Sequence, residues 1–296
     1  MKLGEFEILP VSDGPIKLDG GGMFGIVPKP LWSKFIPADD RNRITIGSTC
    51  MLVRTPHDNV LVETGVGRKL SRKMREIYGI SENVTLEKSL RQHGLKPEDI
   101  TAVIVTHLHF DHAGGCTRLT SDEYRESSDK VPHCVPAFPN ARYYIQRGEW
   151  LAATDPNPAT RATYQLENCL PLESAGLLEL LDGDCELLPG IRVKVLPGHN
   201  AHHQSIVVES QGEGIVCIGD TAPLTINLRP AYNTAFDHEP LRTMESKAML
   251  FDEIIRNNWI AWFYHEPKYT AVTLKHGKEH AEVDRVVIEA DENWLE

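Results

Sequence analysis

Residues 106–115 of the chain read THLHFDHAGG and hold three histidines and one aspartate within the six positions 107–112. The apolar run TAVIV at 101–105 precedes them. Its β-branched residues predict a buried strand. Residues that leave the C-terminal end of such a strand lie at the edge of the sheet, where α/β folds place their sites. Histidine and aspartate at this density are typical of a metal site.

The spacing within this stretch indicates how its side chains are arranged. His107 and His109 are two residues apart, so in extended backbone they point the same way. Asp111 and His112 are expected to begin a turn toward the next helix. Glycines 114 and 115 allow the backbone to pass close to a neighbouring segment.

Three other strand-like segments also end in metal-binding side chains. The run IRVKVLPGH ends with His199, GIVCIGD ends with Asp220, and WIAWFYHE carries His265 near its end. Five histidines and two aspartates are therefore candidates, which suits two metal ions rather than one. The candidate metal ligands are His107, His109, Asp111, His112, His199, Asp220 and His265.

The remaining histidines carry weaker signals. His202 and His203 follow His199 closely, and we interpret them as a pocket wall or as support behind the ligands. The histidines in turn-like or polar stretches are expected to have no role at the site: His57, His93, His133, His238, His276 and His280.

Composition excludes several classes of function. The 296 residues are 41% hydrophobic and 25% charged, as in ordinary soluble proteins. A net charge of −11 argues against nucleic acid or an acidic membrane surface as a partner and leaves a small-molecule substrate.

The chain has no run of 18 apolar residues, so no transmembrane helix is predicted, and its start is expected to form a strand rather than a signal peptide. The six cysteines form no CxxC pair, which indicates free thiols and a cytoplasmic protein. The oligomeric state is not predicted, and a homodimer is one possibility.

Strand-like and helix-like segments are mixed along the chain, which predicts an α/β fold of sheets covered by helices. We expect strands at 6–11, 44–54, 59–62, 141–146, 191–196, 205–208, 215–218 and 259–263, and helices at about 86–93 and 241–257. The segments 44–54 and 59–62 are expected to form a hairpin, and the second helix is expected to share one apolar face among residues 241, 244, 248, 251 and 255. No composition shift marks a linker, so one domain is predicted over 1–296, with an apolar arm at about 20–37.

The motif THLHFDH, with the later GH, GD and strand-end histidine, resembles the metallo-β-lactamase-fold hydrolases. The resemblance covers nearly the whole chain and includes LVETG at 61–65. It implies an αββα sandwich of two mixed sheets flanked by helices, with a two-metal site at one edge of the sheets. It also implies a first-metal set of His107, His109 and His199, a second-metal set of Asp111, His112 and His265, and Asp220 as the bridging carboxylate.

Several branches of the superfamily fit the sequence less well, because they differ from it at the ligand positions or at the chain end. Zinc β-lactamases usually carry a cysteine ligand or lack one of these histidines, and flavodiiron proteins have glutamate where His109 stands. The acidic end at 278–296 differs from the basic one of glyoxalase II, and no basic arm like that of the tRNA-processing phosphodiesterases is present.

The segments GGMFGIVPKPLW at 21–32 and YHEP at 264–267 resemble the N-acyl homoserine lactone lactonases, the quorum-quenching enzymes. Two positions depart from that branch. Glu63 stands where family members usually have aspartate, and Pro223 stands where some lactonases place a catalytic tyrosine.

The resemblance implies that a hydroxide held between two divalent metal ions opens a lactone or ester bond. Zn²⁺ is the expected metal, with iron, manganese or cobalt as alternatives. Asp111 and Asp220 are the expected catalytic carboxylates, and Asp111 passes a proton to the leaving oxygen. The expected substrate pocket residues are Met23, Phe24, Trp32, Tyr232 and Tyr264. The apolar arm either lines an acyl-chain pocket or packs on its own core or a second subunit.

Other activities fit the same residues. Hydrolysis of a thioester, as in glyoxalase II, and hydrolysis of a phosphodiester or organophosphate use the same kind of centre. A metal-binding protein without turnover is a third class. Seven candidate ligands argue against it, because a purely structural zinc site closes with four ligands.

Overall fold

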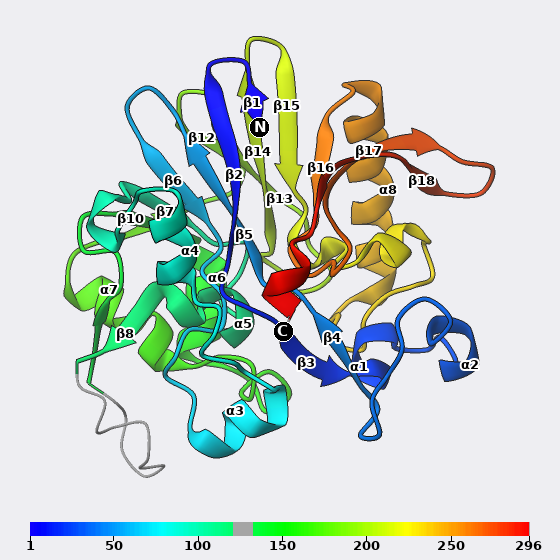
Figure 1. Ribbon diagram of the computed structural model, residues 1–296, viewed down its shortest axis with the longest axis horizontal. Coiled ribbons are helices and arrows are strands. Elements are labelled where there is room, and N and C mark those ends of the chain that lie inside the picture. The colour runs from blue at the N-terminus through cyan, green and yellow to red at the C-terminus, as the bar shows by residue number, and fades with distance from the viewer. Residues whose placement is uncertain (121–132, 296) are drawn as a thin grey trace. The chain divides into compact units, whose positions relative to one another are not determined.

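The computed structural model describes residues 1–120 and 133–295 of the chain. These residues form two compact units, each with its own seven-stranded sheet (Figure 1). Unit 1 consists of Met1–Gly14 and Ser48–Gly183, and unit 2 consists of Pro15–Gly47 and Asp184–Glu296. The single domain expected over 1–296 stays a prediction.

The large sheet of unit 1 is mixed. Its strands are β1 (Lys2–Leu3), β2 (Phe6–Ser12), β5 (Thr49–Arg54), β6 (Asn59–Val62), β7 (Ala102–Ile104), β10 (Arg142–Gln146) and β11 (Leu178–Leu181), paired in that order. β1, β2, β5 and β6 pair antiparallel, whereas β6, β7, β10 and β11 pair parallel. The buried β-branched run predicted at 101–105 therefore forms β7 in the parallel half. Its C-terminal end leads directly into the histidine-rich loop.

Short helices connect the strands of unit 1. They are α3 (Arg72–Tyr78), α4 (Leu86–Gln92), α5 (Phe110–Ala113), α6 (Arg147–Thr154) and α7 (Leu170–Ser174), with 3-10 turns η1 (Pro97–Asp99), η2 (Gly114–Cys116) and η4 (Leu166–Asn168), and a small sheet of β8 (Thr117–Leu119) and β9 (Cys134–Pro136). The Thr85 side chain caps α4 by accepting the Lys88 N–H at 3.2 Å, and Leu86 and Leu90 are buried. The helix predicted at 86–93 is thus confirmed except for its last residue.

The two glycines after the histidines lie against the backbone that follows β6. A Cβ at Gly114 would come within 2.0 Å of the Val66 carbonyl oxygen, and one at Gly115 within 2.0 Å of that of Thr64. The Thr64 N–H also donates to the His112 carbonyl at 3.0 Å. Only glycine fits at these two positions, so the predicted close backbone approach is confirmed.

The large sheet of unit 2 is mostly antiparallel. Its strands are β12 (Cys185–Leu188), β13 (Ile191–Val195), β14 (Gln204–Ser210), β15 (Glu213–Cys217), β16 (Ile260–Trp262), β17 (Tyr269–His276) and β18 (Ala281–Glu289), paired in that order. Only the β15–β16 pair is parallel among these strands. Unit 2 also contains β3 (Ile16–Asp19), β4 (Arg43–Ile46), α1 (Gly20–Phe24), α2 (Lys29–Trp32), α8 (Pro240–Arg256), η5 (Gly219–Thr221), η6 (Thr225–Leu228) and η7 (Glu292–Leu295).

The long helix α8 covers part of this sheet and runs alongside β17 (Figure 1). Leu250, Phe251 and Ile254 belong to a buried cluster that also contains Trp259 and Val272. The helix predicted at 241–257 is confirmed, but its expected inner face is partly wrong, because Leu241 is 76% exposed. Polar residues occupy the inner face instead, and these are Thr243, Ser246 and Lys247. They can be buried because they hydrogen-bond to backbone carbonyls, as Ser246 does to Pro197 at 2.6 Å.

The strand expected over 44–54 is two strands in the structure. β4 pairs with β3 in unit 2, whereas β5 pairs with β2 and β6 in unit 1. The division falls after Gly47, whose N–H donates to the His265 carbonyl at 3.0 Å. The expected hairpin is therefore correct for β5 and β6 and wrong for residues 44–46. The β-branched residues at 44–46 show that the segment is extended, but they do not show which partner strand it takes.

The apolar arm at 20–37 contains α1 and α2. Phe24 and Trp32 stack with ring centroids 5.0 Å apart and an interplanar angle of 15°. Both side chains are buried, whereas Ile26 is 89% exposed. The segment is thus ordered by its own aromatic contact.

Among the described residues, no helix combines the length and the apolar character needed to span a membrane. All six cysteines are free thiols.

Candidate metal centre

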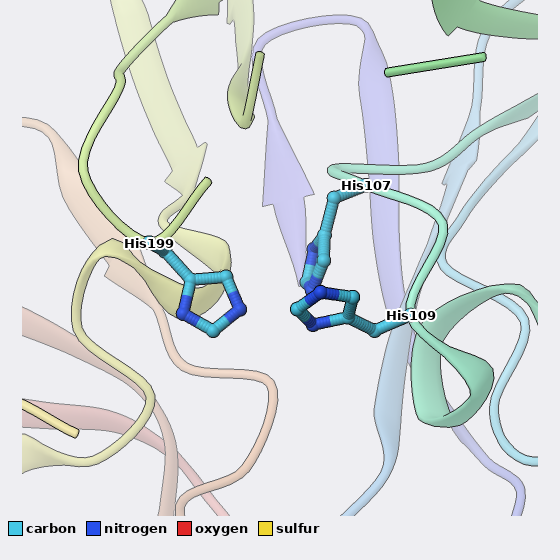
Figure 2. Close-up of side chains that lie close together, drawn as sticks. All are labelled: His107, His109 and His199. Atoms are coloured by element: carbon cyan, nitrogen blue, oxygen red, sulfur yellow. The ribbon is translucent and has the colours of Figure 1, made fainter. Parts of the chain in front are cut away.

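Four of the seven candidate ligands lie on the loop after β7 in unit 1. His107, His109, Asp111 and His112 are all buried. The ligand atoms of His107 lie within 4.8 Å of those of His109 and of those of His112. Those of Asp111 and His112 also lie within 4.8 Å of one another. Figure 2 shows the rings of His107 and His109 turned toward one another.

The short helix α5 explains why these four side chains meet. His109 is extended, with φ −61° and ψ 150°, and stands immediately before the helix. Its carbonyl accepts the N–H of His112 at 3.0 Å and of Ala113 at 2.9 Å. The ring of His107 consequently has its centroid 4.3 Å from that of His109 and 4.1 Å from that of His112. Two extended residues followed by one helical turn bring the side chains together, in agreement with the predicted spacing.

Buried polar groups orient two of these imidazoles. Thr106 Oγ1 lies 2.8 Å from His107 Nδ1, and Glu63 Oε1 lies 3.2 Å from His112 Nδ1. Glu63 Oε1 also accepts the Thr106 N–H at 3.3 Å. The backbone of Glu63 has φ +68°, a left-handed conformation that is uncommon outside glycine and typical of functional sites. An imidazole whose Nδ1 is engaged in this way presents Nε2 to a metal.

The other three candidates lie in unit 2 at the ends of three strands. His199, labelled in Figure 2, follows β13, while Asp220 lies in η5 after β15 and His265 follows β16. The two carboxylate oxygens of Asp220 face different rings. Oδ2 lies 3.4 Å from His199 Nε2, and Oδ1 lies 3.5 Å from His265 Nε2. A carboxylate with each oxygen beside a different imidazole is suited to bind two metal ions.

The two candidate histidines of unit 2 also have a polar partner at the ring nitrogen Nδ1. His199 Nδ1 lies 3.0 Å from Asp237 Oδ1, and that oxygen also accepts the Thr234 hydroxyl at 2.8 Å. His265 Nδ1 lies 2.8 Å from the Gly47 carbonyl. Both rings therefore direct Nε2 toward Asp220. Asp237 was not predicted, because a carboxylate 38 residues from its histidine leaves no local spacing to detect.

His203 supports the backbone of Asp220. The Asp220 N–H donates to His203 Nε2 at 3.0 Å, and Thr221 Oγ1 lies 3.3 Å from His203 Nδ1. His203 is fully buried. Its contacts agree with the interpretation of His203 as support behind the ligands.

A buried lysine stabilises the segment that leads to Asp237. Lys247 donates to Asn233 Oδ1 at 2.6 Å and to the Tyr232 carbonyl at 2.8 Å. Burial lowers the pKa of the Lys247 ammonium to about 8, and the Asp237 carboxylate opposes that shift. Lys247 was not predicted, because the sequence pattern of α8 indicates an apolar buried face, on which a lysine is not expected.

A tyrosine in unit 1 also lies beside the ligand loop. The Tyr78 ring packs on Phe110 with centroids 4.8 Å apart. Burial and the Asp111 carboxylate raise the pKa of the Tyr78 hydroxyl above its ordinary value. The position was not predicted, because nothing near Tyr78 in the sequence marks it.

The expected substrate pocket residues all lie in unit 2. Met23, Phe24 and Trp32 are buried in the arm. Tyr264 is buried, with its ring centroid 4.5 Å from that of His265. Tyr232 is half-buried, and its hydroxyl accepts Arg229 Nη1 at 3.3 Å. Their role as a pocket stays a prediction.

The donor groups in each unit fit divalent metal ions. All seven side chains are buried and offer imidazole nitrogen or carboxylate oxygen, the donors that zinc, iron, manganese and cobalt accept. Four of the five imidazoles have Nδ1 beside an oxygen, as metal-binding histidines usually do. No part of this arrangement requires a sulfur ligand.

Comparison with known proteins gives a decisive match. The family model of the metallo-beta-lactamase superfamily matches residues 44–259. The chain belongs to this superfamily. It therefore has the metallo-β-lactamase fold of two large mixed sheets with helices, and it is a metal-dependent hydrolase. The resemblance read from THLHFDH and the predicted fold class are confirmed.

Three proteins illustrate the range of similar superfamily members. An N-acyl homoserine lactonase from Bacillus cereus is 29% identical over 194 residues, which cover 62% of this chain and 67% of the relative. A solved structure of a probable metal-dependent hydrolase from Staphylococcus aureus has 32% identity and a TM-score of 0.86, covering 98% of both chains. A dizinc quorum-quenching lactonase solved with a product has 20% identity and a TM-score of 0.74, covering 96% of both chains, and shows the shared fold alone.

Proposed function

We propose that this superfamily member is a dinuclear-metal hydrolase that opens lactones of the N-acyl homoserine class. The observation that carries the two-metal part is Asp220, whose two oxygens lie 3.4 and 3.5 Å from Nε2 of His199 and His265. The substrate class is supported by the identity to the Bacillus cereus lactonase.

The residues that would hold the metals are His107, His109, Asp111, His112, His199, Asp220 and His265. Two bound divalent ions would supply a nucleophile at neutral pH by lowering the pKa of a water molecule, and would polarise the ester carbonyl. Zn²⁺ is our proposed metal, because imidazole and carboxylate are among its usual ligands, and iron, manganese and cobalt are the alternatives that accept the same donors.

Asp111 is the proposed proton carrier. Its carboxylate is buried in α5, with an oxygen within 4.8 Å of a ring nitrogen of His112. A carboxylate oxygen of Asp111 would take the proton of the attacking water and give it to the ring oxygen that leaves the carbonyl carbon. The product is a single hydroxy acid, because a lactone ring opens without losing a fragment.

The arm is the proposed wall for the acyl chain. Met23, Phe24 and Trp32 form its apolar side, and Tyr232 and Tyr264 are the proposed polar contacts of the substrate. The six free cysteines support a cytoplasmic location, where thiols stay reduced.

The test is the initial rate of acid release when zinc-loaded protein meets a long-chain N-acyl homoserine lactone. A chelator-treated sample is the control. We expect fast release that the chelator abolishes. An absence of release from protein with two bound zinc ions would reject the lactonase proposal and favour thioester or phosphodiester hydrolysis by the same centre.

A further inference from the structure

A buried glutamate that is not one of the seven candidate ligands contacts the ligand loop of unit 1. Glu149 lies in the first turn of α6 and is 1% exposed. Its Oε1 accepts the backbone N–H of Leu108 at 2.8 Å. Leu108 stands between His107 and His109, so this hydrogen bond acts on the peptide that joins the two histidines.

A tyrosine extends the same contact to one of the imidazoles. The Tyr164 hydroxyl donates to Glu149 Oε1 at 3.1 Å. Its ring lies 5.2 Å from that of His109, at an angle of 59°. The backbones of Tyr164 and His109 form an isolated β-bridge, and the Phe110 N–H donates to the Thr163 carbonyl at 2.9 Å.

One carboxylate oxygen thus fixes the loop in two ways. It binds the peptide N–H between the two histidines, and it holds the tyrosine whose ring packs on His109. Hydrogen bonds to a charged acceptor are about twice as strong as neutral ones. Without the carboxylate, the Leu108 N–H would be buried with no acceptor, which a folded chain avoids by moving the loop.

We propose that Glu149 is a positioning residue, which together with Tyr164 sets the separation and ring orientation of His107 and His109. This inference rests on the proposed function, in which these two histidines are metal ligands. Glu149 itself touches neither substrate nor metal. Its effect passes through the Leu108 peptide and the Tyr164 ring.

The proposed role of Glu149 predicts a different metal affinity for each of three substitutions. Glu149→Ala removes both hydrogen bonds and is expected to weaken metal binding by about 10- to 100-fold, the usual effect of losing support behind a ligand. Glu149→Gln retains an oxygen for the Leu108 N–H and is expected to recover most of the affinity. Tyr164→Phe retains the ring on His109 but loses the hydroxyl bond, so its effect is expected to be smaller than that of Glu149→Ala.

The test is competition for Zn²⁺ against a chromophoric chelator, together with the visible absorption spectrum of cobalt-loaded protein. Tyr143→Phe is the matched control. It removes another buried tyrosine hydroxyl of unit 1, which accepts the Phe138 N–H at 2.9 Å and donates to the Cys116 carbonyl at 3.1 Å, and neither residue is a candidate ligand. We expect lower affinity and a changed cobalt spectrum for Glu149→Ala, and neither change for the control.

Two results would overturn the inference, and they differ from a failure of the proposed function. Wild-type affinity and an unchanged cobalt spectrum in Glu149→Ala would show that the glutamate is only a packing residue. If Glu149→Ala does not fold, wild-type affinity and an unchanged cobalt spectrum in Tyr164→Phe, which loses its hydroxyl bond to Glu149, would lead to the same conclusion. If His109→Ala binds zinc as tightly as wild type, the ligand assignment itself fails.

Discussion

The two units supply their candidate ligands in different ways. Unit 1 places four of them on one loop of six residues, where covalent connection and a single helical turn bring the side chains together. Unit 2 draws its three from the segments that follow β13, β15 and β16, and the first and last of these ligands, His199 and His265, are 66 positions apart along the chain. The first set needs little more than local backbone geometry. The second set comes together only when β13, β14, β15 and β16 pair in the sheet.

The polar groups that contact the ligand histidines also differ between the units in how far along the chain they lie from those histidines. In unit 1, Thr106 lies next to the histidine that it contacts, although Glu63 and Glu149 come from other elements. In unit 2, Asp237 and the Gly47 carbonyl are distant in sequence from the histidines they contact. The difference teaches that a dense local motif marks a site, while dispersed ligands depend on contacts that only the folded sheet provides.

The comparison is tested most strongly by removing one ligand from each unit. We expect His109→Ala and His199→Ala each to lower the rate of lactone hydrolysis by at least about 1,000-fold, because polarisation of the carbonyl by a metal is worth several kcal/mol. The measurement is the rate of acid release together with the number of bound zinc ions per chain. Near-normal activity of His199→Ala, alongside an inactive His109→Ala, would mean that the ligands of unit 1 suffice alone.

Removal of a supporting carboxylate in unit 2 should have an intermediate effect. Asp237→Ala leaves His199 Nδ1 without its carboxylate, and we expect zinc affinity to fall by about 10- to 100-fold. Competition with a chelator measures the affinity. Asp184→Ala is the matched control, since this exposed carboxylate bonds the Val195 N–H at 2.7 Å and reaches no ligand. Equal affinities of the two variants would contradict the role of Asp237.

The smallest expected effect concerns the buried lysine of unit 2. The pKa of Lys247 is about 8 in the folded chain, below the 10.5 of an exposed lysine. Between these values the unfolded chain binds a proton that the folded chain lacks, so the contribution of Lys247 to the free energy of unfolding rises with pH. Below pH 8 that contribution stays nearly constant.

The variant Lys247→Met lacks this titration. We expect the free energy of unfolding of wild type, relative to Lys247→Met, to increase by about 1 kcal/mol between pH 8 and pH 9. Urea unfolding of metal-free protein at several pH values measures it. A difference that stays constant, or that shrinks as the pH rises, would show that Lys247 titrates normally in the folded chain.

Much of the fold was predictable because hydrophobic periodicity is local. The runs that form β7, α4 and α8 carry their own pattern, and their predicted bounds agree closely with those observed. The prediction was wrong where partners mattered. Residues 44–46 pair with β3 rather than extending β5, and the inner face of α8 includes Lys247, because pairing and burial depend on what the rest of the chain presents.

The sequence by itself determined the superfamily, the histidine-rich loop and the seven candidate ligands, because each candidate stands in a short motif just after a segment with a strand pattern. Only the tertiary structure revealed what holds those side chains in place. Glu149, Asp237 and the Gly47 carbonyl reach their partners across 41, 38 and 218 positions of the chain. Such contacts leave no local spacing to read, because they form only when burial brings distant polar groups together and each must find a partner.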